Sequence, residues 1–116
     1  MSIWPISHIQ FNMKKCLKNK VSKSLGDYER QARIHKALAN EARLMIVDSL
    51  RECECSVGEL TRCVGLDQST VSKHLSVLFN AGIVEKRKQA NLIFYKLLTP
   101  CVLDMFACTV RVLDGR

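Results

Sequence analysis

Six cysteines are the residues of this 116-residue chain with the widest range of chemistry. A thiolate binds soft metal and metalloid ions, and two neighbouring thiols can instead be oxidised to a disulfide or carry a persulfide. Cys53 and Cys55 are separated by one residue in a polar stretch, and extended backbone there would point both sulfurs to one side. This pair is the first candidate site for a thiophilic ion, with As(III) ahead of the Cd, Pb and Zn class.

The other cysteines could supply a third sulfur from elsewhere in the chain. Cys101 and Cys108 would share one stripe of a helix but lie about 10 Å apart along its axis, so they would act across a dimer or with the first pair. Cys16 lies among lysines, which favour the thiolate, whereas Cys63 is predicted to face the core. Incidental loop thiols and small apolar residues in a dimer seam are the alternatives. The candidate ligands are Cys53, Cys55, Cys101, Cys108 and Cys16.

Length and composition narrow the class of protein. A chain of 116 residues with 47% hydrophobic and 25% charged residues fits one small domain with an ordinary core, so no cofactor is expected to be required for folding. No apolar run approaches the roughly 18 residues of a membrane helix. Lys14 and Lys15 follow the apolar start, whereas a secretory signal has its basic residues first. A cytoplasmic protein with no membrane partner is expected, starting at Met1 or at Met13.

The net charge of +7 indicates a polyanionic partner, and it has two sources. Residues 1–26 contain five lysines and no acidic residue, which predicts a basic, flexible N-terminal tail that either solubilises the chain or contacts phosphates. Residues 73–96 contain five basic residues against Glu85 alone. The second source coincides with a structured motif.

Two helices are predicted first in the domain of residues 27–116. Asp27 is the candidate N-cap of an amphipathic helix that ends near Leu38. Asn40 is the candidate N-cap of a second helix that runs to about Glu52. Its apolar residues predict a mostly buried helix, and they are Ala42, Leu44, Met45, Ile46, Val47 and Leu50.

The next two helices form a helix-turn-helix pattern. Ser56 caps a short helix that ends at Gly65, and Asp67 caps a longer one that stops at Gly82. The longer helix has apolar residues at helical spacing, namely Val71, Leu75, Leu78 and Phe79. Its solvent side carries side chains that can bond base edges or phosphates. They are Gln68, Ser69, Thr70, Ser72, Lys73 and His74.

A β-hairpin and a last helix complete the pattern. Residues 83–88 and 92–97 are rich in β-branched and aromatic residues, and Asn91 is expected to supply a positive φ in the turn between them. Thr99 would cap the last helix, with Pro100 at its first position. That helix is apolar on most sides, so we expect a dimer interface, together with the first helix. The basic residues of the hairpin could reach phosphates or the minor groove, and they are Lys86, Arg87 and Lys88.

The expected fold is therefore mostly α with a small β-hairpin: a winged helix-turn-helix of order α-α-α-α-β-β-α, homodimeric through its terminal helices. The sequence resembles the ArsR/SmtB family of winged-helix transcriptional repressors over about residues 28–97. The resemblance implies a homodimer that binds a palindromic operator in double-stranded DNA and is released by an inducer, usually a thiophilic or transition metal ion. The matching stretches are residues 37–44, 57–60, 68–78, 80–84, 87–88 and 95–97.

Departures from the family pattern concern the inducer. Members that sense arsenic, cadmium or lead often carry Cys-Val-Cys directly before Glu-Leu, but here Ser56 and Gly58 occupy the cysteine positions. Zinc-sensing members use Asp and His on the last helix; Asp104 matches one ligand, but no histidine follows His74. Sensing through nitrogen ligands is therefore not expected.

Four functions remain open at this point. The first is a repressor that leaves DNA when cysteine thiolates bind a thiophilic ion such as As(III). The second is a repressor that responds to oxidation or persulfidation of a cysteine pair. A DNA-binding protein without an inducer is the third. An enzyme with a cysteine nucleophile is the least favoured, because His74 lies on the expected DNA face and no oxyanion motif follows any cysteine.

Overall fold

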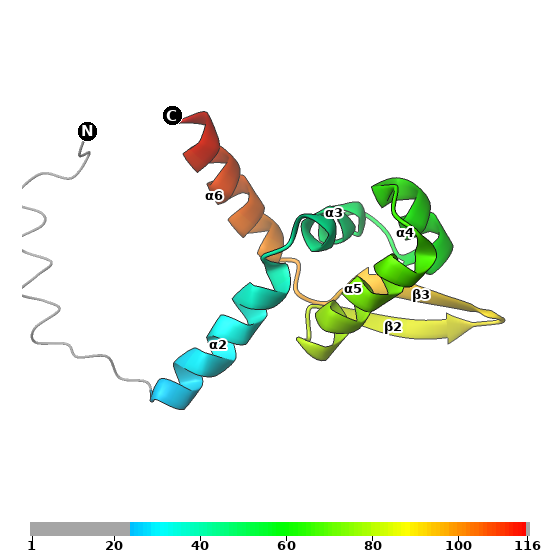
Figure 1. The fold of residues 1–116 in the computed structure, drawn as a ribbon, viewed down its shortest axis with the longest axis horizontal. Coiled ribbons are helices and arrows are strands. Elements are labelled where there is room, and N and C mark those ends of the chain that lie inside the picture. Colours follow the sequence, from blue (N-terminus) through cyan, green and yellow to red (C-terminus); the bar gives the residue numbers. More distant parts are fainter. Residues whose placement is uncertain (1–23, 116) are drawn as a thin grey trace, which may run out of the picture. The chain divides into compact units, whose positions relative to one another are not determined.

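The computed structural model describes residues 24–115, and contacts divide the chain into two units, Met1–Gln31 and Ala32–Arg116. Five helices and three strands follow one another in the described part (Figure 1). They are α2 (Leu25–Leu38), α3 (Glu41–Ser49), β1 (Cys55–Ser56), α4 (Val57–Val64), α5 (Gln68–Asn80), β2 (Val84–Gln89), β3 (Leu92–Leu97) and α6 (Val102–Asp114). The predicted helices and hairpin are thus present, and β1 is an addition.

The start of α2 is capped by Ser24. The Asp27 backbone N–H donates to Ser24 Oγ over 3.2 Å, and the Ser24 backbone N–H donates to Asp27 Oδ2 over 3.2 Å. This reciprocal pair satisfies two amide groups that have no partner within the helix. The prediction of Asp27 as the N-cap is wrong, because Asp27 is the third helical residue and the helix begins two residues earlier.

Asn40 caps α3 as predicted, with its side chain accepting a hydrogen bond from the Arg43 backbone N–H. The helix ends at Ser49, earlier than expected. Ile46 and Val47 are fully buried, but Leu44 and Met45 are 38% and 46% exposed. The prediction that α3 is mostly buried is therefore wrong for these two residues, which lie on the side of α3 turned away from the core.

The helix-turn-helix consists of α4 and α5. Ser56 caps α4 in a capping box with Glu59, and Gly65 ends the helix at a φ of 73°, a left-handed conformation that glycine adopts without strain. After α5, the Ile83 N–H bonds to the Leu78 carbonyl and Gly82 has a φ of 81°, which ends this helix at the predicted place. The core side chains that α5 supplies are Val71, Leu75 and Leu78.

The sheet has three antiparallel strands in the order β1-β3-β2. β1 has only two residues, which is too short for the alternating pattern that identifies a strand from sequence. Its pairing of Cys55 with Tyr95 ties the cysteine-bearing segment to the hairpin. Ala90, and not Asn91 as predicted, has the positive φ in the hairpin turn, at 55°.

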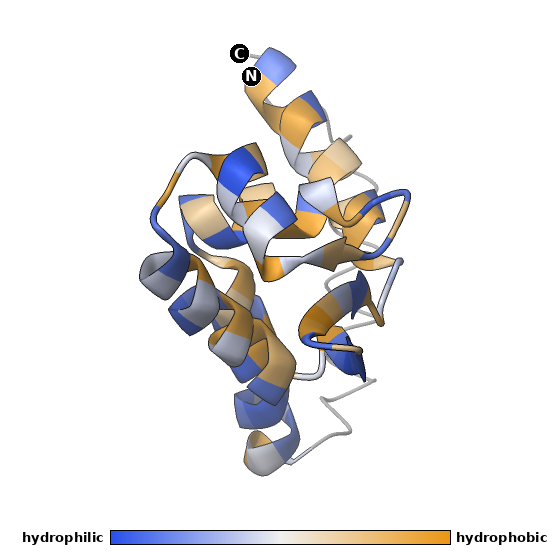
Figure 2. Cartoon of the chain, turned by 90° about the vertical axis from the view of Figure 1, so that its right-hand side faces the viewer, coloured by the Kyte–Doolittle hydropathy of each residue, from blue (hydrophilic) through white to orange (hydrophobic). Residues whose placement is uncertain are grey.

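α6 begins at Val102, with Cys101 at the N-cap position and no side-chain cap. Thr99 was the predicted cap, but its Oγ1 is buried without a hydrogen-bond partner within the described chain. Val102 is the one buried residue of α6. Figure 2 shows apolar residues recurring along this exposed helix up to the C-terminus. Among the described helices, none is long and apolar enough to cross a membrane.

Candidate nucleic-acid interface

α5 presents a polar surface because its three core residues lie on the opposite side. Val71, Leu75 and Leu78 have no exposed surface, which fixes the rotation of the helix about its axis. The predicted DNA-binding residues then lie on or beside the solvent face: Gln68, Ser69, Ser72 and Lys73 are exposed, and Thr70 and His74 are half-buried. The helix-turn-helix therefore brings all six predicted residues of α5 together.

The first turn of α5 is organised by Asp67. Its carboxylate accepts hydrogen bonds from the hydroxyls of Ser69 and Thr70, and these bonds hold the pKa of Asp67 below its usual value. Because both hydroxyl hydrogens are directed to Asp67, the two side chains offer lone pairs to an approaching ligand. They can accept from base amino groups, whereas phosphate oxygens need donors such as Lys73 or Gln68.

The hairpin joins this surface through Lys86. Its ammonium lies 4.5 Å from the centre of the Phe79 ring, so strand β2 and helix α5 are linked by a cation–π contact. Phe79, which the sequence groups with the apolar residues at helical spacing, is 39% exposed. Side chains alternate between the two faces of a strand, so Lys88 lies on the same face of β2 as Lys86. These two lysines extend the polar surface of α5 along the hairpin.

Arg87 lies on the opposite face of β2 and is paired with Glu54. Its Nε and Nη2 donate to the two carboxylate oxygens of Glu54 over 2.8 Å and 2.9 Å, and Nη1 donates to Gln89 Oε1 over 2.6 Å. The guanidinium beside Glu54 lowers the pKa of that carboxyl, and the carboxylate raises the pKa of Arg87. The structure thus separates Arg87 from Lys86 and Lys88, the residues with which it was grouped.

The two cysteines that flank Glu54 differ in exposure. Cys53 is exposed in a bend, whereas Cys55 is buried in β1. The Cys55 thiol lies within weak hydrogen-bonding distance of the carbonyls of Ser49 at 3.8 Å and Cys53 at 3.7 Å. Burial, together with the neighbouring Cys53 thiol, raises the pKa of Cys55 to about 11. Cys55 is therefore a protonated thiol at neutral pH and a poor ligand until it loses that proton.

The remaining cysteines do not join this pair in a closed ligand set. Cys101 and Cys108 are exposed on α6, where Arg111 Nη2 lies 3.4 Å from the Cys108 sulfur, and Cys16 lies outside the described residues. Cys63 is exposed, so its prediction as a core residue is wrong. Within residues 24–115, no three His, Cys, Asp or Glu side chains are grouped so that they could hold a metal ion. Residues 24–115 of a single chain therefore do not offer three ligands to a thiophilic ion in this conformation.

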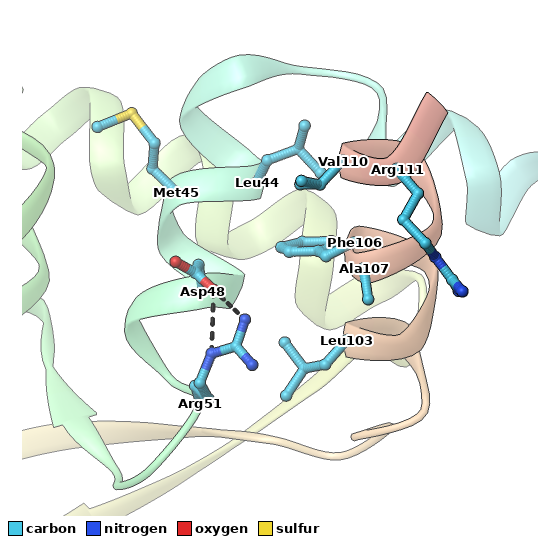
Figure 3. Close-up of a pocket in the computed structure, with 9 residues that line it drawn as sticks. All are labelled: Leu44, Met45, Asp48, Arg51, Leu103, Phe106, Ala107, Val110 and Arg111. Atoms are coloured by element: carbon cyan, nitrogen blue, oxygen red, sulfur yellow. Dashed lines mark hydrogen bonds and ion pairs between the residues drawn. The ribbon is translucent and has the colours of Figure 1, made fainter. Parts of the chain in front are cut away.

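A second surface, away from the polar face of α5, lies between α3 and α6. Leu44 and Met45 of α3 and Phe106 and Val110 of α6 line an open apolar pocket. In Figure 3, Phe106 and Leu103 point toward α3 while Arg111 points away from it. Exposed apolar residues continue along α6 to Leu113. The dimer interface was predicted from the apolar residues of the last helix, and several of these residues lie on this surface.

Three functional candidates were missed in the sequence. No motif in the sequence distinguishes Glu54 from other glutamates, and its pairing partner Arg87 is 33 positions away. Phe79 was counted with the apolar stripe of its helix, although its contact with Lys86 joins helix to hairpin. Cys63, which was expected in the core, is an exposed thiol. Helical periodicity alone could have placed Cys63 at the edge of the Leu60–Val64 stripe, but no local signal identifies the other two.

Comparison with known proteins places these features in context. Residues 40–86 match the model of the bacterial regulatory protein, arsR family. The transcriptional activator HlyU of Vibrio cholerae is 48% identical over 77 residues, covering 66% of this chain and 71% of HlyU. The biofilm growth-associated repressor of Xylella fastidiosa is 47% identical over 66 residues, covering 57% of this chain and 58% of the repressor.

Solved structures agree with the fold. Reduced HlyU from Vibrio cholerae aligns with a TM-score of 0.65 at 38% identity, covering 75% of this chain and 92% of that structure. A homodimeric winged helix-turn-helix DNA-binding domain from Mycobacterium bovis aligns with a TM-score of 0.68 at 31% identity, covering 82% of this chain and 91% of that domain. The winged helix-turn-helix prediction is confirmed.

Proposed function

Since the chain belongs to the ArsR family of bacterial regulatory proteins, we propose that it is a homodimeric, sequence-specific repressor whose hold on DNA depends on its cysteine thiols. Membership of the family makes it a DNA-binding transcriptional regulator and not an enzyme. The finer parts of the proposal are the residues that touch DNA, the dimer surface and the chemistry that releases DNA. Each has its own support and its own test.

The observation that carries the DNA-binding proposal is the exposed polar face of α5 together with the face of β2 that carries Lys86 and Lys88. Lys73, Lys86 and Lys88 supply cations, and within residues 24–115 none of them is paired with a carboxylate. Gln68 and Ser72 supply groups that can read base edges from the first turns of a helix in the major groove. α5 is therefore the recognition helix, and the hairpin contacts the adjacent backbone.

The DNA-binding proposal is tested by replacing Lys73 with alanine. Binding to double-stranded DNA from the region upstream of the gene should weaken, and the slope of log K against log salt should become less negative by about 0.9, the effect of one lost phosphate contact. Asp114→Ala, at the far end of α6, is the control and should leave the slope unchanged. An unchanged slope for Lys73→Ala would remove α5 from the DNA interface.

The dimer proposal rests on the apolar surface of α3 and α6. Val110 and Leu113 are both at least half exposed in a single chain, which is unfavourable in water unless another surface covers them. A second copy is the partner of choice, because a palindromic operator is read by two recognition helices about 34 Å apart. The Mycobacterium bovis domain, described as homodimeric, shares this fold.

Release by a thiophilic ion, As(III) or an ion of the Cd, Pb and Zn class, would use Cys53 and Cys55 with a third thiolate. The described part of one chain holds no group of three ligands. The third ligand would therefore be Cys16, or it would be Cys101 or Cys108, brought close by a rearrangement of the chain or supplied by a second copy. The test is arsenite titration of the DNA complex with wild type, Cys53→Ser and Cys55→Ser. Arsenite should release wild type only, and release of both variants at the same concentration would exclude this site.

Release by thiol oxidation is the second candidate, and two observations favour it. Within residues 24–115, Cys53 and Cys55 are close in the chain and have no third ligand beside them, and the HlyU structure is described as that of the reduced protein. A disulfide forms when the two thiols lose two protons and two electrons to an oxidant such as hydrogen peroxide, which becomes two water molecules. Peroxide-treated protein should contain an intramolecular disulfide by mass spectrometry and bind DNA less tightly. Recovery of free thiols only would eliminate this trigger.

A further inference from the structure

We propose that Glu54 and Arg87 form a clasp that positions the hairpin, so that Arg87 is a positioning residue and Lys86 and Lys88 are the hairpin's DNA contacts. The inference rests on the proposed DNA-binding function and refines it, because all three basic residues look equivalent in the sequence. The name clasp is used below for the bidentate pair of Glu54 with Arg87.

The first argument is that every nitrogen of the Arg87 side chain already has a partner. Nε and Nη2 donate to Glu54, and Nη1 donates to Gln89. The guanidinium carbon also lies 5.3 Å from the centre of the Phe94 ring, on the adjacent strand β3. A planar guanidinium bound by two parallel charge-assisted hydrogen bonds has a defined orientation, unlike a free surface lysine.

The second argument comes from the two faces of the sheet. Glu85 and Arg87 share one face of β2, and the paired residues Lys96 and Phe94 lie on the same face of β3. Glu85 forms an ion pair with Lys96 over 3.0 Å, so the four charged side chains on this face balance one another. The face that contacts α5 through Lys86 and Phe79 has the unbalanced positive charge. DNA phosphates are therefore attracted to the face of Lys86 and Lys88 and only weakly to the face of Glu85 and Arg87.

The third argument is energetic. To bind a phosphate, Arg87 would have to break two charge-assisted hydrogen bonds in order to make two of the same kind. The exchange would also leave the Glu54 carboxylate unpaired next to a polyanion, which is repulsive. If Arg87 moved from Glu54 to a phosphate, it would neutralise one negative charge on DNA and expose another on Glu54. The net number of counterions released from the complex would therefore not change. Arg87 should therefore contribute nothing to the salt dependence of binding.

The clasp connects segments that are distant in the chain. Glu54 directly precedes β1, whose residues Cys55 and Ser56 pair with β3, while Arg87 lies on β2 at the far side of that strand. The clasp thus spans all three strands and holds the hairpin to the segment that carries the two thiols. Loss of the clasp would loosen the hairpin relative to α5 without removing a DNA contact.

The experiment compares Arg87→Ala with Lys88→Ala, two neighbouring positions at which the same charge is removed from opposite faces. Binding to a mixed-sequence duplex of about 30 base pairs is measured over a range of salt concentrations. Lys88→Ala should make the slope less negative by about 0.9. Arg87→Ala should keep the wild-type slope and lose up to about fivefold in affinity at every salt concentration, the range expected for one exposed ion pair.

A second variant keeps the net charge constant. Glu54→Gln combined with Arg87→Gln replaces the ion pair with two amides that can still bond, so affinity should return to within about twofold of wild type at an unchanged slope. The clasp is refuted if Arg87→Ala changes the slope as much as Lys88→Ala does, or if the double variant binds as weakly as Arg87→Ala. The proposed function itself fails in a different way, with a Lys88→Ala slope equal to that of wild type.

Discussion

The helix-turn-helix and the α3–α6 surface both contain amphipathic helices, but only the first buries its apolar residues within one chain. Leu60, Val71, Leu75 and Leu78 have no exposed surface, whereas Leu113 of α6 is 63% exposed. The helix-turn-helix thus buries its core within one chain, whereas the apolar surface of α3 and α6 stays exposed. The difference indicates that apolar residues on α6 are there to bind a partner, because exposed apolar area of this extent is unfavourable in water.

The largest expected effect tests the buried core of the helix-turn-helix. Leu75→Ala removes a fully buried side chain from α5 and should lower the free energy of unfolding by about 3 kcal/mol, through lost apolar burial and the cavity left behind. Urea denaturation measures the change. Leu92→Ala, at a 55% exposed position of the hairpin, is the matched control and should change stability by less than about 0.5 kcal/mol. Equal losses would show that exposure in the single chain does not report the core.

The next prediction tests the exposed apolar surface of α3 and α6. Val110→Glu places a charge in the apolar surface and should weaken the dimer at least tenfold, about 1.4 kcal/mol, because the carboxylate would have to be buried without a partner. Sedimentation equilibrium measures the dimer, and circular dichroism checks that the helices persist. Val112→Glu is the matched control, since Val112 lies on the other side of α6. Dissociation by Val112→Glu alone would move the interface to that side.

A smaller effect concerns strain at the tip of the otherwise well-packed hairpin. Ala90 has a φ of 55°, a left-handed conformation that costs a residue with a Cβ roughly 1 kcal/mol. Ala90→Gly should therefore raise the free energy of unfolding by up to about 1 kcal/mol in urea denaturation. Asn91→Gly, at the neighbouring turn position without a positive φ, should bring no gain. Stabilisation by Asn91→Gly and not by Ala90→Gly would reverse the assignment of the strained residue.

A last prediction uses pH to test the buried Cys55 thiol. The pKa of Cys55 is about 11 in the folded chain against 9.0 for an unburied thiol, so the folded state binds the proton more tightly. This contribution to stability is complete below pH 9 and is lost as pH rises from 9 toward 11. The difference in stability between wild type and Cys55→Ala should therefore shrink over that interval. Leu75→Ala, which removes a buried side chain without an ionisable group, should show a constant difference.

Local signals were sufficient where one short segment decides the structure. Asn40, Ser56 and Asp67 all occupy the predicted N-cap positions. The Asn40 and Ser56 side chains accept hydrogen bonds from backbone amides three residues later, and Asp67 accepts from the nearby hydroxyls of Ser69 and Thr70, so each contact lies within one turn of chain. Glycines after α4 and α5 end these helices for an equally local reason. The caps of the first and last helices were misplaced, since several polar residues at each start could have served and only the position of the helix selects among them.

Contacts between distant segments could not be predicted in this way. The clasp joins Glu54 to Arg87, and the two-residue strand β1 exists only because β3 is there to pair with it. The exposure of Cys63, which was predicted to face the core, and the burial of Cys55 in a polar stretch have the same reason. Burial depends on which elements cover a residue, and neither spacing nor residue type specifies that cover.

The sequence by itself determined the helices, the hairpin, the family and the polar face of α5, because periodicity, capping and composition act over one or two turns of chain. The tertiary structure decided which charges are paired and which thiols are accessible. It paired Arg87 with Glu54, left Lys86 and Lys88 without a carboxylate partner in the described part of the chain, and buried Cys55 beside an exposed Cys53. Ion pairing and burial depend on distance in space, and that distance is set only when the strands and helices pack together.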